Sequence, residues 1–435
     1  MLKRLGPSAL TAGETTSTAL FPSKLEFNAP VHGTWNIVHI GMLVPEAHQI
    51  YVCALNCMRG VVLTAAEMGA LDRFSCVVLK EEDITRGTVE QITLDGIRDV
   101  LHKLPKLPPC VIVFPVCTHL FLGVPMGRVY RQLEAEFPQV DFVRGFMDPI
   151  SKKRLIPDKR LRKVMYDPLP VVEPDDSLVT LLGSEFAPDE DSDLRKILRS
   201  GGLRLASIHD CKTYEEFLGL ARAGTIVSVF PSGEWGARKT AERLGRPHLY
   251  LPATFDYEQI EGQEGQLFDF FGLPYPDFAA ERASCDEELA ETLAVVGDAP
   301  IAIDAVVHPR PLELARLLIE HGFNVREVYL DGVNEEEAAA LDWLREHAPE
   351  LELSSTILPD LRVAPRTRQE KTLAIGPKAA WFTGTGYFVN LVYGGGLWGF
   401  AGVRSMARLM REAWRSEKDT RDIVPRKGLG CVSCI

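Results

Sequence analysis

The amino-acid sequence predicts an α/β protein made of three Rossmann-like domains, each built on a parallel sheet. Short apolar runs alternate with amphipathic stretches from residue 36 onward, which is typical of strands and helices around a parallel sheet. The alternation repeats in three successive blocks, and 435 residues with 46% hydrophobic content suffice for several cores. We therefore predict an N-terminal extension (1–35), domains at 36–150, 177–297 and 298–418, and a C-terminal tail (419–435).

The first domain is predicted from alternating segments that end near residue 146. The expected strands are NIVHIGML (36–43), HQIYVCAL (48–55), RFSCVVL (73–79), CVIVFPVC (110–117) and VDFVRGF (140–146). The expected helices are MRGVVLTAAEMGAL (58–71), VEQITLDGIRDVLHKL (89–104) and VPMGRVYRQLEAEF (124–137). The next segment, 147–176, is charged and rich in proline, and its X-Pro steps predict a linker without a helix.

The other two domains show the same alternation. The second has expected strands at 177–184, 203–209, 225–230 and 248–254, and helices at 191–200, 214–223, 235–245 and onward to 296. The third has expected strands at 300–307, 325–332, 351–358 and 371–376, and helices at 311–323, 335–348 and 401–416. Ligands of such sheets lie at the carboxyl ends of strands. The residues at those ends are Cys117, Thr118, His119, Gly183, Ser184, His209, Asp210, Cys211, Pro231, Ser232, Gly233, Thr254 and His308.

Composition excludes several classes of protein. No apolar run reaches the roughly 18–20 residues that a membrane span needs, so we expect no membrane segment. The first residues lack a continuous apolar stretch followed by a cleavage motif, which predicts a cytoplasmic location. A net charge of −12 argues against a nucleic-acid partner, whose phosphates it would repel.

Nine cysteines in a chain without a secretion signal indicate thiols or metal ligands rather than disulfides. Cys57 and Cys117 each end a predicted strand of the first sheet and precede a turn into a helix, so both lie at one edge of that sheet. Cys53 is the next candidate ligand, and Cys110, which begins the strand that Cys117 ends, is the last. Packing roles or no role are expected for Cys76, Cys211 and Cys285. The tail pair Cys431 and Cys434 forms C-x-x-C, which suits a metal or redox pair and equally a dispensable tail.

Four passages resemble the nitrogenase component 1 family. HQIYVCALNCMRGVV is similar to the family's strand that ends in a cluster-ligating cysteine, here Cys57. EEDITRGTVE is similar to the acidic segment that follows, and VIVFPVCTHLFLG to the segment with a second ligand, here Cys117. NLVYGGGLWGFAGVRSMARLM is similar to the aromatic and glycine segment that leads into the family's last helix. The resemblance extends over nearly the whole chain and agrees with the plan of three α/β blocks.

The resemblance implies a subunit of an oxidoreductase complex, a nitrogenase-like reductase of heterotetrameric type. Cys57, Cys117 and Cys53 would hold an iron–sulfur cluster, either an [8Fe-7S] P-cluster-like group or [4Fe-4S], at the interface with a homologous sister subunit. An ATP-dependent iron protein-like reductase, itself carrying [4Fe-4S], would deliver the electrons. That ATPase role falls to a partner because this chain has no G-x-x-x-x-G-K-[ST] motif.

Two departures from the family pattern narrow this interpretation. Where the family has a third cysteine upstream of Cys57, this chain has His32. Either His32 or the nearby Cys53 replaces that ligand, or the cluster is simpler and His32 is a surface histidine. Where the catalytic subunit has a cofactor cysteine, this chain has Ser232 in FPSGEWG. We therefore expect a beta-type partner subunit, with reductive C–S cleavage of methylthio-alkanes as the first candidate reaction. The alternatives are a cluster-assembly scaffold and a homologue that reduces or binds a tetrapyrrole.

Overall fold

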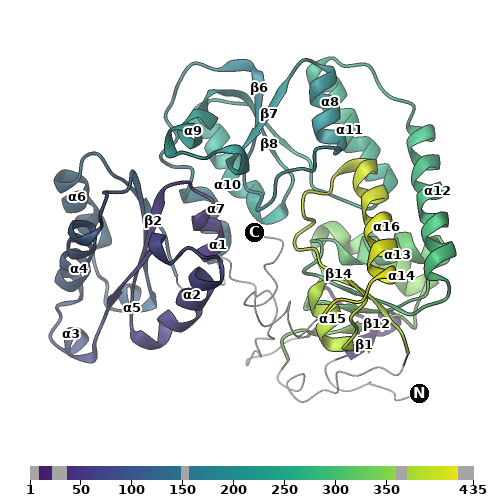
Figure 1. Ribbon diagram of the computed structural model, residues 1–435, viewed down its shortest axis with the longest axis horizontal. Coiled ribbons are helices and arrows are strands. Elements are labelled where there is room, and N and C mark those ends of the chain that lie inside the picture. Colours follow the sequence, from purple (N-terminus) through teal and green to yellow (C-terminus); the bar gives the residue numbers. More distant parts are fainter. Residues whose placement is uncertain (1–8, 22–36, 148–155, 359–369, 420–435) are drawn as a thin grey trace. The chain divides into compact units, whose positions relative to one another are not determined.

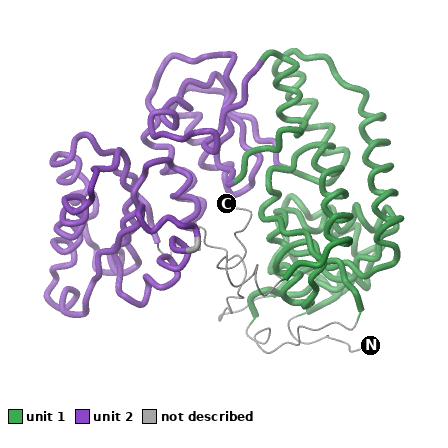
Figure 2. The backbone as a smooth tube through the Cα atoms, viewed as in Figure 1, with its two compact units in different colours: residues 1–33, 186–202, 253–435 green, residues 34–185, 203–252 purple. Residues whose placement is uncertain are grey.

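The structure is a computed structural model that describes residues 9–21, 37–147, 156–358 and 370–419. The chain forms two compact units (Figure 2). Unit 1 contains residues 1–33, 186–202 and 253–435, and unit 2 contains residues 34–185 and 203–252. Three sheets are present among the described residues, and the predicted α/β class with parallel sheets is confirmed. The three predicted domain boundaries stay a prediction.

Unit 2 contains two four-stranded parallel sheets (Figure 1). The first has the order β3-β2-β4-β5, formed by Phe74–Val78, Ala47–Cys53, Cys110–Pro115 and Asp141–Arg144. The second has the order β7-β6-β8-β9, formed by Arg204–Ser207, Asp175–Leu181, Ala223–Ser228 and His248–Tyr250. The helices of this unit are α1 (Ile37–Met42), α2 (Leu55–Glu67), α3 (Glu81–Thr85), α4 (Val89–Lys103), α5 (Cys117–Phe121), α6 (Met126–Glu136), α7 (Pro157–Val164), α9 (Tyr214–Gly219) and α10 (Pro231–Leu244).

Apolar residues on both faces bury the first sheet. Tyr51 and Phe114 point into a core with α1, α2 and α7, whereas Ile50, Val52 and Val113 point into a core with α4 and α6. Successive strand residues alternate between the two faces, so each strand reads as a continuous apolar run. The continuous apolar run of each strand ends at the carboxyl edge of the sheet, and the residues that follow β2 and β4 there include Cys57 and Cys117.

Unit 1 is built on a six-stranded sheet with the order β1-β12-β11-β10-β13-β14. Its strands are Ala9–Thr11, Glu352–Ser354, Val325–Tyr329, Ile301–Asp304, Leu373–Ile375 and Phe388–Val389. All neighbours are parallel except β1, which pairs antiparallel with β12. The helices are α8 (Asp193–Ser200), α11 (Tyr257–Phe271), α12 (Phe278–Val296), α13 (Pro311–Glu320), α14 (Ala338–His347), α15 (Pro377–Thr383) and α16 (Gly399–Arg415).

Residues 36–43 were expected to form a strand, and that expectation is wrong, because Ile37–Met42 form helix α1. The helix lies tightly on β2, where the Gln49 side-chain amide donates to the Val38 carbonyl at 2.9 Å. A Cβ on Gly41 would come within 2.6 Å of that amide nitrogen. A short apolar run fits a buried helix as well as a buried strand, and only this packing separates the two.

The linker predicted at 147–176 contains a helix, α7, which corrects the expectation of a helix-free segment. Pro157 occupies the first turn, where a helix tolerates its missing N–H. Arg162, only 1% exposed, bonds to Asp158 at 2.8 Å, to the Gly183 carbonyl at 2.8 Å and to Glu185. This basic segment therefore forms a helix with a buried arginine because Glu185, in the loop after β6, neutralises the Arg162 guanidinium.

Among the described residues, no helix is both long enough and apolar enough to cross a membrane.

Candidate functional site

Cys57 and Cys117 lie at one edge of the first sheet. Strands β2 and β4 are parallel neighbours, with Val52 opposite Pro115 near their carboxyl ends. Helix α2 begins at Leu55, two residues after β2, and α5 begins at Cys117, two residues after β4. Cys57 is in the first turn of α2, where its backbone N–H donates to Ala54 at 2.9 Å. Both cysteines therefore lie in the first turns of the helices that follow two adjacent strands, whereas the sequence analysis placed each at the end of a strand.

The two thiols are open to a ligand. Cys57 is exposed and Cys117 is partly exposed. The N-terminus of the 13-residue helix α2 favours negative charge near Cys57, which suits a thiolate. Within the described residues, no group of three or more His, Cys, Asp or Glu side chains converges as a metal site. The edge thus offers two thiols and not a complete ligand set.

Cys53 has the environment of a packed thiol. It is fully buried at the end of β2, in the core with α1, α2 and α7. Burial, together with the nearby Cys76 and Cys57 thiols, raises the pKa of Cys53 to about 12. A ligand role requires Cys53 to lose its proton inside that core, and it stays a prediction.

The other candidate ligands divide into packed residues and residues that the structure does not describe. Cys110 is fully buried, and burial raises the pKa of its thiol to about 12. Cys285 is buried in unit 1, and Cys76 and Cys211 are half-buried in unit 2. His32, Cys431 and Cys434 lie outside the described residues, so their roles stay predictions.

Exposed apolar side chains lie on or next to the two helices that carry the thiols. They are Leu55 and Leu63 of α2 at 69% and 52% exposed, and Leu120, Phe121 and Leu122 at 54%, 69% and 45%. We call this set the edge surface. Arg59 is the only charged residue between positions 55 and 66, so α2 presents few groups that prefer water. Several large apolar side chains exposed on neighbouring helices are a feature of surfaces that bind another macromolecule.

His119 holds the turn that carries Cys117. It is 3% exposed, and its Nδ1 accepts the Val116 backbone N–H at 3.2 Å. Nε2 therefore carries the ring proton and donates to Thr93 Oγ1 at 3.0 Å. Burial lowers the pKa of His119 to about 4, so the ring is neutral and fixes α5 against α4. The sequence placed His119 at the strand end but gave no sign of this positioning role.

The second sheet's edge is closed by backbone. A Cβ on Gly183 would lie 2.6 Å from the Cα of Gly233, so the loop after β6 touches the first turn of α10 directly. Ser232 precedes that contact in the first turn of α10. This close approach explains why positions 183 and 233 are glycine. It assigns no ligand role to Ser232.

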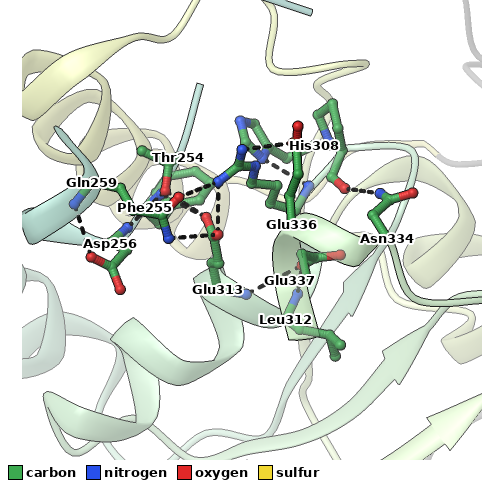
Figure 3. A network of polar contacts seen from close by, with 12 residues as sticks. Thr254, Phe255, Asp256, Gln259, His308, Leu312, Glu313, Asn334, Glu336 and Glu337 are labelled. Carbon is green, nitrogen blue, oxygen red and sulfur yellow. Dashed lines mark hydrogen bonds and ion pairs between the residues drawn. The ribbon is translucent and has the colours of Figure 1, made fainter. Parts of the chain in front are cut away.

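Unit 1 places His308 in a buried network after β10 (Figure 3). Its Nδ1 accepts the Arg310 backbone N–H at 3.1 Å, and burial lowers the pKa of the ring to about 3. The Arg310 guanidinium donates to Glu313 at 2.9 Å and to Glu336 at 2.7 Å. The network gives His308 a structural explanation, because its neutral ring holds the backbone of Arg310, the residue that precedes α13.

Sequence reasoning missed a buried ionic group at the same edge of that sheet. Asp304 ends β10 with no exposure, and burial raises its pKa to about 6. Lys378 on α15 is 6% exposed, donates to Thr356 Oγ1 at 3.2 Å, and has its pKa lowered by burial. A charged residue closing the apolar run IAID was the available signal.

A cleft of about 340 Å³ lies elsewhere in unit 1, beside α11, α12 and α13. Asp286 accepts the Tyr257 hydroxyl at 2.9 Å and contacts His321 Nε2 at 3.0 Å within it. The cleft is not at a strand end, so the strand-end rule did not predict it.

Solved structures of known proteins decide what this arrangement resembles. The chain aligns with nitrogenase Cp1 at pH 6.5 with a TM-score of 0.66 and 10% identity, covering 93% of this chain and 95% of that one. The chain has the fold of nitrogenase Cp1. The alignment with nitrogenase Cp1 at pH 5 gives a TM-score of 0.55 and 12% identity, with 94% of each chain covered. No protein-family model matches the sequence, and no curated protein matches it. The resemblance drawn from the sequence is therefore confirmed for the fold.

Proposed function

We propose that this chain is a subunit of a nitrogenase-like reductase and holds an iron–sulfur cluster at a subunit interface. The observation that carries the proposal is the position of Cys57 and Cys117, two accessible thiols in the first turns of the helices that follow adjacent strands. The irons of such clusters take thiolate ligands. Exposed apolar side chains near the ligands would exclude water from the site once a partner covers them.

The two edge thiols suit part of the ligand set of such a group. Both thiols are accessible, and the start of α2 favours the negative charge of a thiolate-bound cluster. When bound, the cluster supplies one-electron transfer from an ATP-dependent reductase partner toward the active site of the complex. His119 keeps Cys117 in place, and the edge surface excludes water when a partner subunit lies on it.

The reaction is proposed as reductive C–S cleavage of methylthio-alkanes. This chain has Ser232 at the start of α10, where the nitrogenase catalytic subunit has its cofactor cysteine. The serine supports a subunit that does not hold that cofactor. Turnover with a methylthio-alkane, an ATPase partner and a reductant tests this finer statement, and release of the thiol product supports it.

The cluster itself is tested by anaerobic purification of the full chain. We expect iron, acid-labile sulfide and an EPR signal that appears or disappears reversibly upon reduction. Cys57→Ala and Cys117→Ala should each remove most of the iron, whereas Cys211→Ala, a half-buried thiol elsewhere in unit 2, should not. Iron content that is unchanged in both edge variants would refute the assignment.

A further inference from the structure

Three side chains that line the cleft of unit 1 join the three helices beside it. The Tyr257 hydroxyl, at the start of α11, donates to Asp286 Oδ1 of α12 at 2.9 Å. His321, the residue that follows α13, brings Nε2 within 3.0 Å of the same oxygen. We call Tyr257, Asp286 and His321 the cleft tie. One carboxylate oxygen thus connects the start of α11, the middle of α12 and the end of α13.

Both ring nitrogens of His321 face oxygens that accept hydrogen bonds. Nδ1 lies 2.8 Å from the Leu317 carbonyl, and Nε2 lies 3.0 Å from the Asp286 carboxylate. A neutral imidazole carries one N–H, so one of the two contacts would then set a nitrogen lone pair against an oxygen lone pair. Both contacts are hydrogen bonds when the ring carries two protons. The geometry therefore requires an imidazolium at this position.

The surroundings of His321 favour a positive charge. The ring lies at the carboxyl end of the ten-residue helix α13, where the carbonyl dipoles attract a cation. Beyond the cleft tie, the titratable side chains that line the cleft are Asp256, Glu258, Glu313, Glu320, Arg282 and Arg316. Carboxylates thus outnumber guanidinium groups. Burial raises the pKa of Tyr257, so its hydroxyl keeps its proton and continues to donate to Asp286.

His347 in the same unit provides a natural comparison. It ends α14, and its Nδ1 lies 3.0 Å from the Trp343 carbonyl, which repeats the four-residue spacing of His321 and Leu317. Its ring stacks on Trp343 with centroids 4.5 Å apart, and its Nε2 has no hydrogen-bond partner within the described part of the chain. One ring proton satisfies His347. The need for a second proton at His321 therefore comes from Asp286 and not from the helix end.

We propose that the cleft tie is a proton-operated latch, which holds the end of α13 against α12 while His321 is an imidazolium and releases it when the second proton leaves. Without that proton, the Nε2 lone pair faces the Asp286 carboxylate and the contact becomes repulsive. The latch is then closed at acidic pH and open at alkaline pH, and opening widens the cleft. The inference concerns unit 1 alone and goes beyond the proposed cluster function.

Amide hydrogen exchange of the full chain, followed by mass spectrometry, tests the latch. Rates are measured at about pH 6 and about pH 8.5, on either side of the range in which imidazoles titrate, and are corrected for the intrinsic effect of pH. We expect protection at the end of α13 to fall about two- to fivefold at the higher pH, as for loss of a partly exposed ion pair. The end of α14, which contains His347, is the internal reference and should show no such fall.

Asp286→Asn separates the latch from an ordinary structural contact. The asparagine amide can donate to a neutral ring, so this variant should keep its protection at both pH values. His321→Ala should show the lower protection at both pH values, whereas the matched control His347→Ala should behave as wild type at α13. A fall in Asp286→Asn as large as in wild type, an equal fall at the end of α14, or no fall in wild type would each overturn the latch. The readout requires no iron, so it is independent of the proposed cluster.

Discussion

Glu264→Gln should stabilise this protein at alkaline pH relative to the wild type. Glu264 of α11 is 3% exposed and accepts the Phe400 backbone N–H at the start of α16, while Asp193 of α8 accepts the Ala401 N–H at 2.7 Å. Two carboxyl groups thus cap one helix. A Cβ on Gly399 would lie 2.7 Å from Asp193 Oδ2 and 2.8 Å from Glu264 Oε1, and that second oxygen has no hydrogen-bond partner.

Burial first, and then the charges of Asp193 and Glu281, raise the pKa of Glu264 from 4.5 to about 8. The folded state therefore binds this proton more tightly than the unfolded state. The resulting stability is fully present below pH 4.5 and is lost as the pH rises through about 8. At about 1.4 kcal/mol per pKa unit, the loss approaches an upper limit of about 5 kcal/mol. Glutamine keeps the shape of the protonated acid and does not ionise, so the variant escapes this loss.

The assay is denaturant unfolding of the full chain at pH 5 and pH 8.5. We expect the free energy of unfolding of Glu264→Gln to exceed that of the wild type by a margin that grows between these pH values. Glu258→Gln, an exposed acid on the same helix, is the control and should show no such growth. A difference between Glu264→Gln and wild type that is the same at both pH values would refute the shared-cap reasoning.

Three further predictions concern packing and positioning. Gly399→Ala should lower the free energy of unfolding by about 1–3 kcal/mol or more, because φ is +71° and the capping carboxylates fill the space of a Cβ; an unchanged denaturation midpoint would contradict this. Arg162→Ala should cost about 3–5 kcal/mol in the same measurement, since it leaves Glu185 and a second buried carboxyl without their cation. His119→Ala should reduce iron retention and lower stability by about 1–3 kcal/mol, as the turn before Cys117 loses two buried hydrogen bonds; normal iron retention on gel filtration would argue against the positioning role.

Much of the fold could be predicted from local patterns. The strands that contain Tyr51 and Phe114 could both be predicted, because strands buried on two faces give continuous apolar runs bounded by turns. The helix at Ile37–Met42 was not predicted, because a mostly apolar segment of six residues is too short to show a period that separates a buried helix from a strand. The helix that contains Arg162 was not predicted, because its segment is charged and rich in proline and the partner that neutralises Arg162, Glu185, is distant in sequence.

The sequence by itself determined that two cysteines follow strands of the first sheet. Cys57 and Cys117 follow two strands, and parallel strands bring their carboxyl ends together wherever they are neighbours. Only the tertiary structure decided which cysteines are accessible, because Cys53 and Cys57 lie four residues apart, yet Cys53 ends the buried strand β2 and Cys57 is exposed in the first turn of α2. It also decided the protonation of Glu264 and the placement of Arg162, since desolvation and charge pairing depend on groups that the chain brings together from afar.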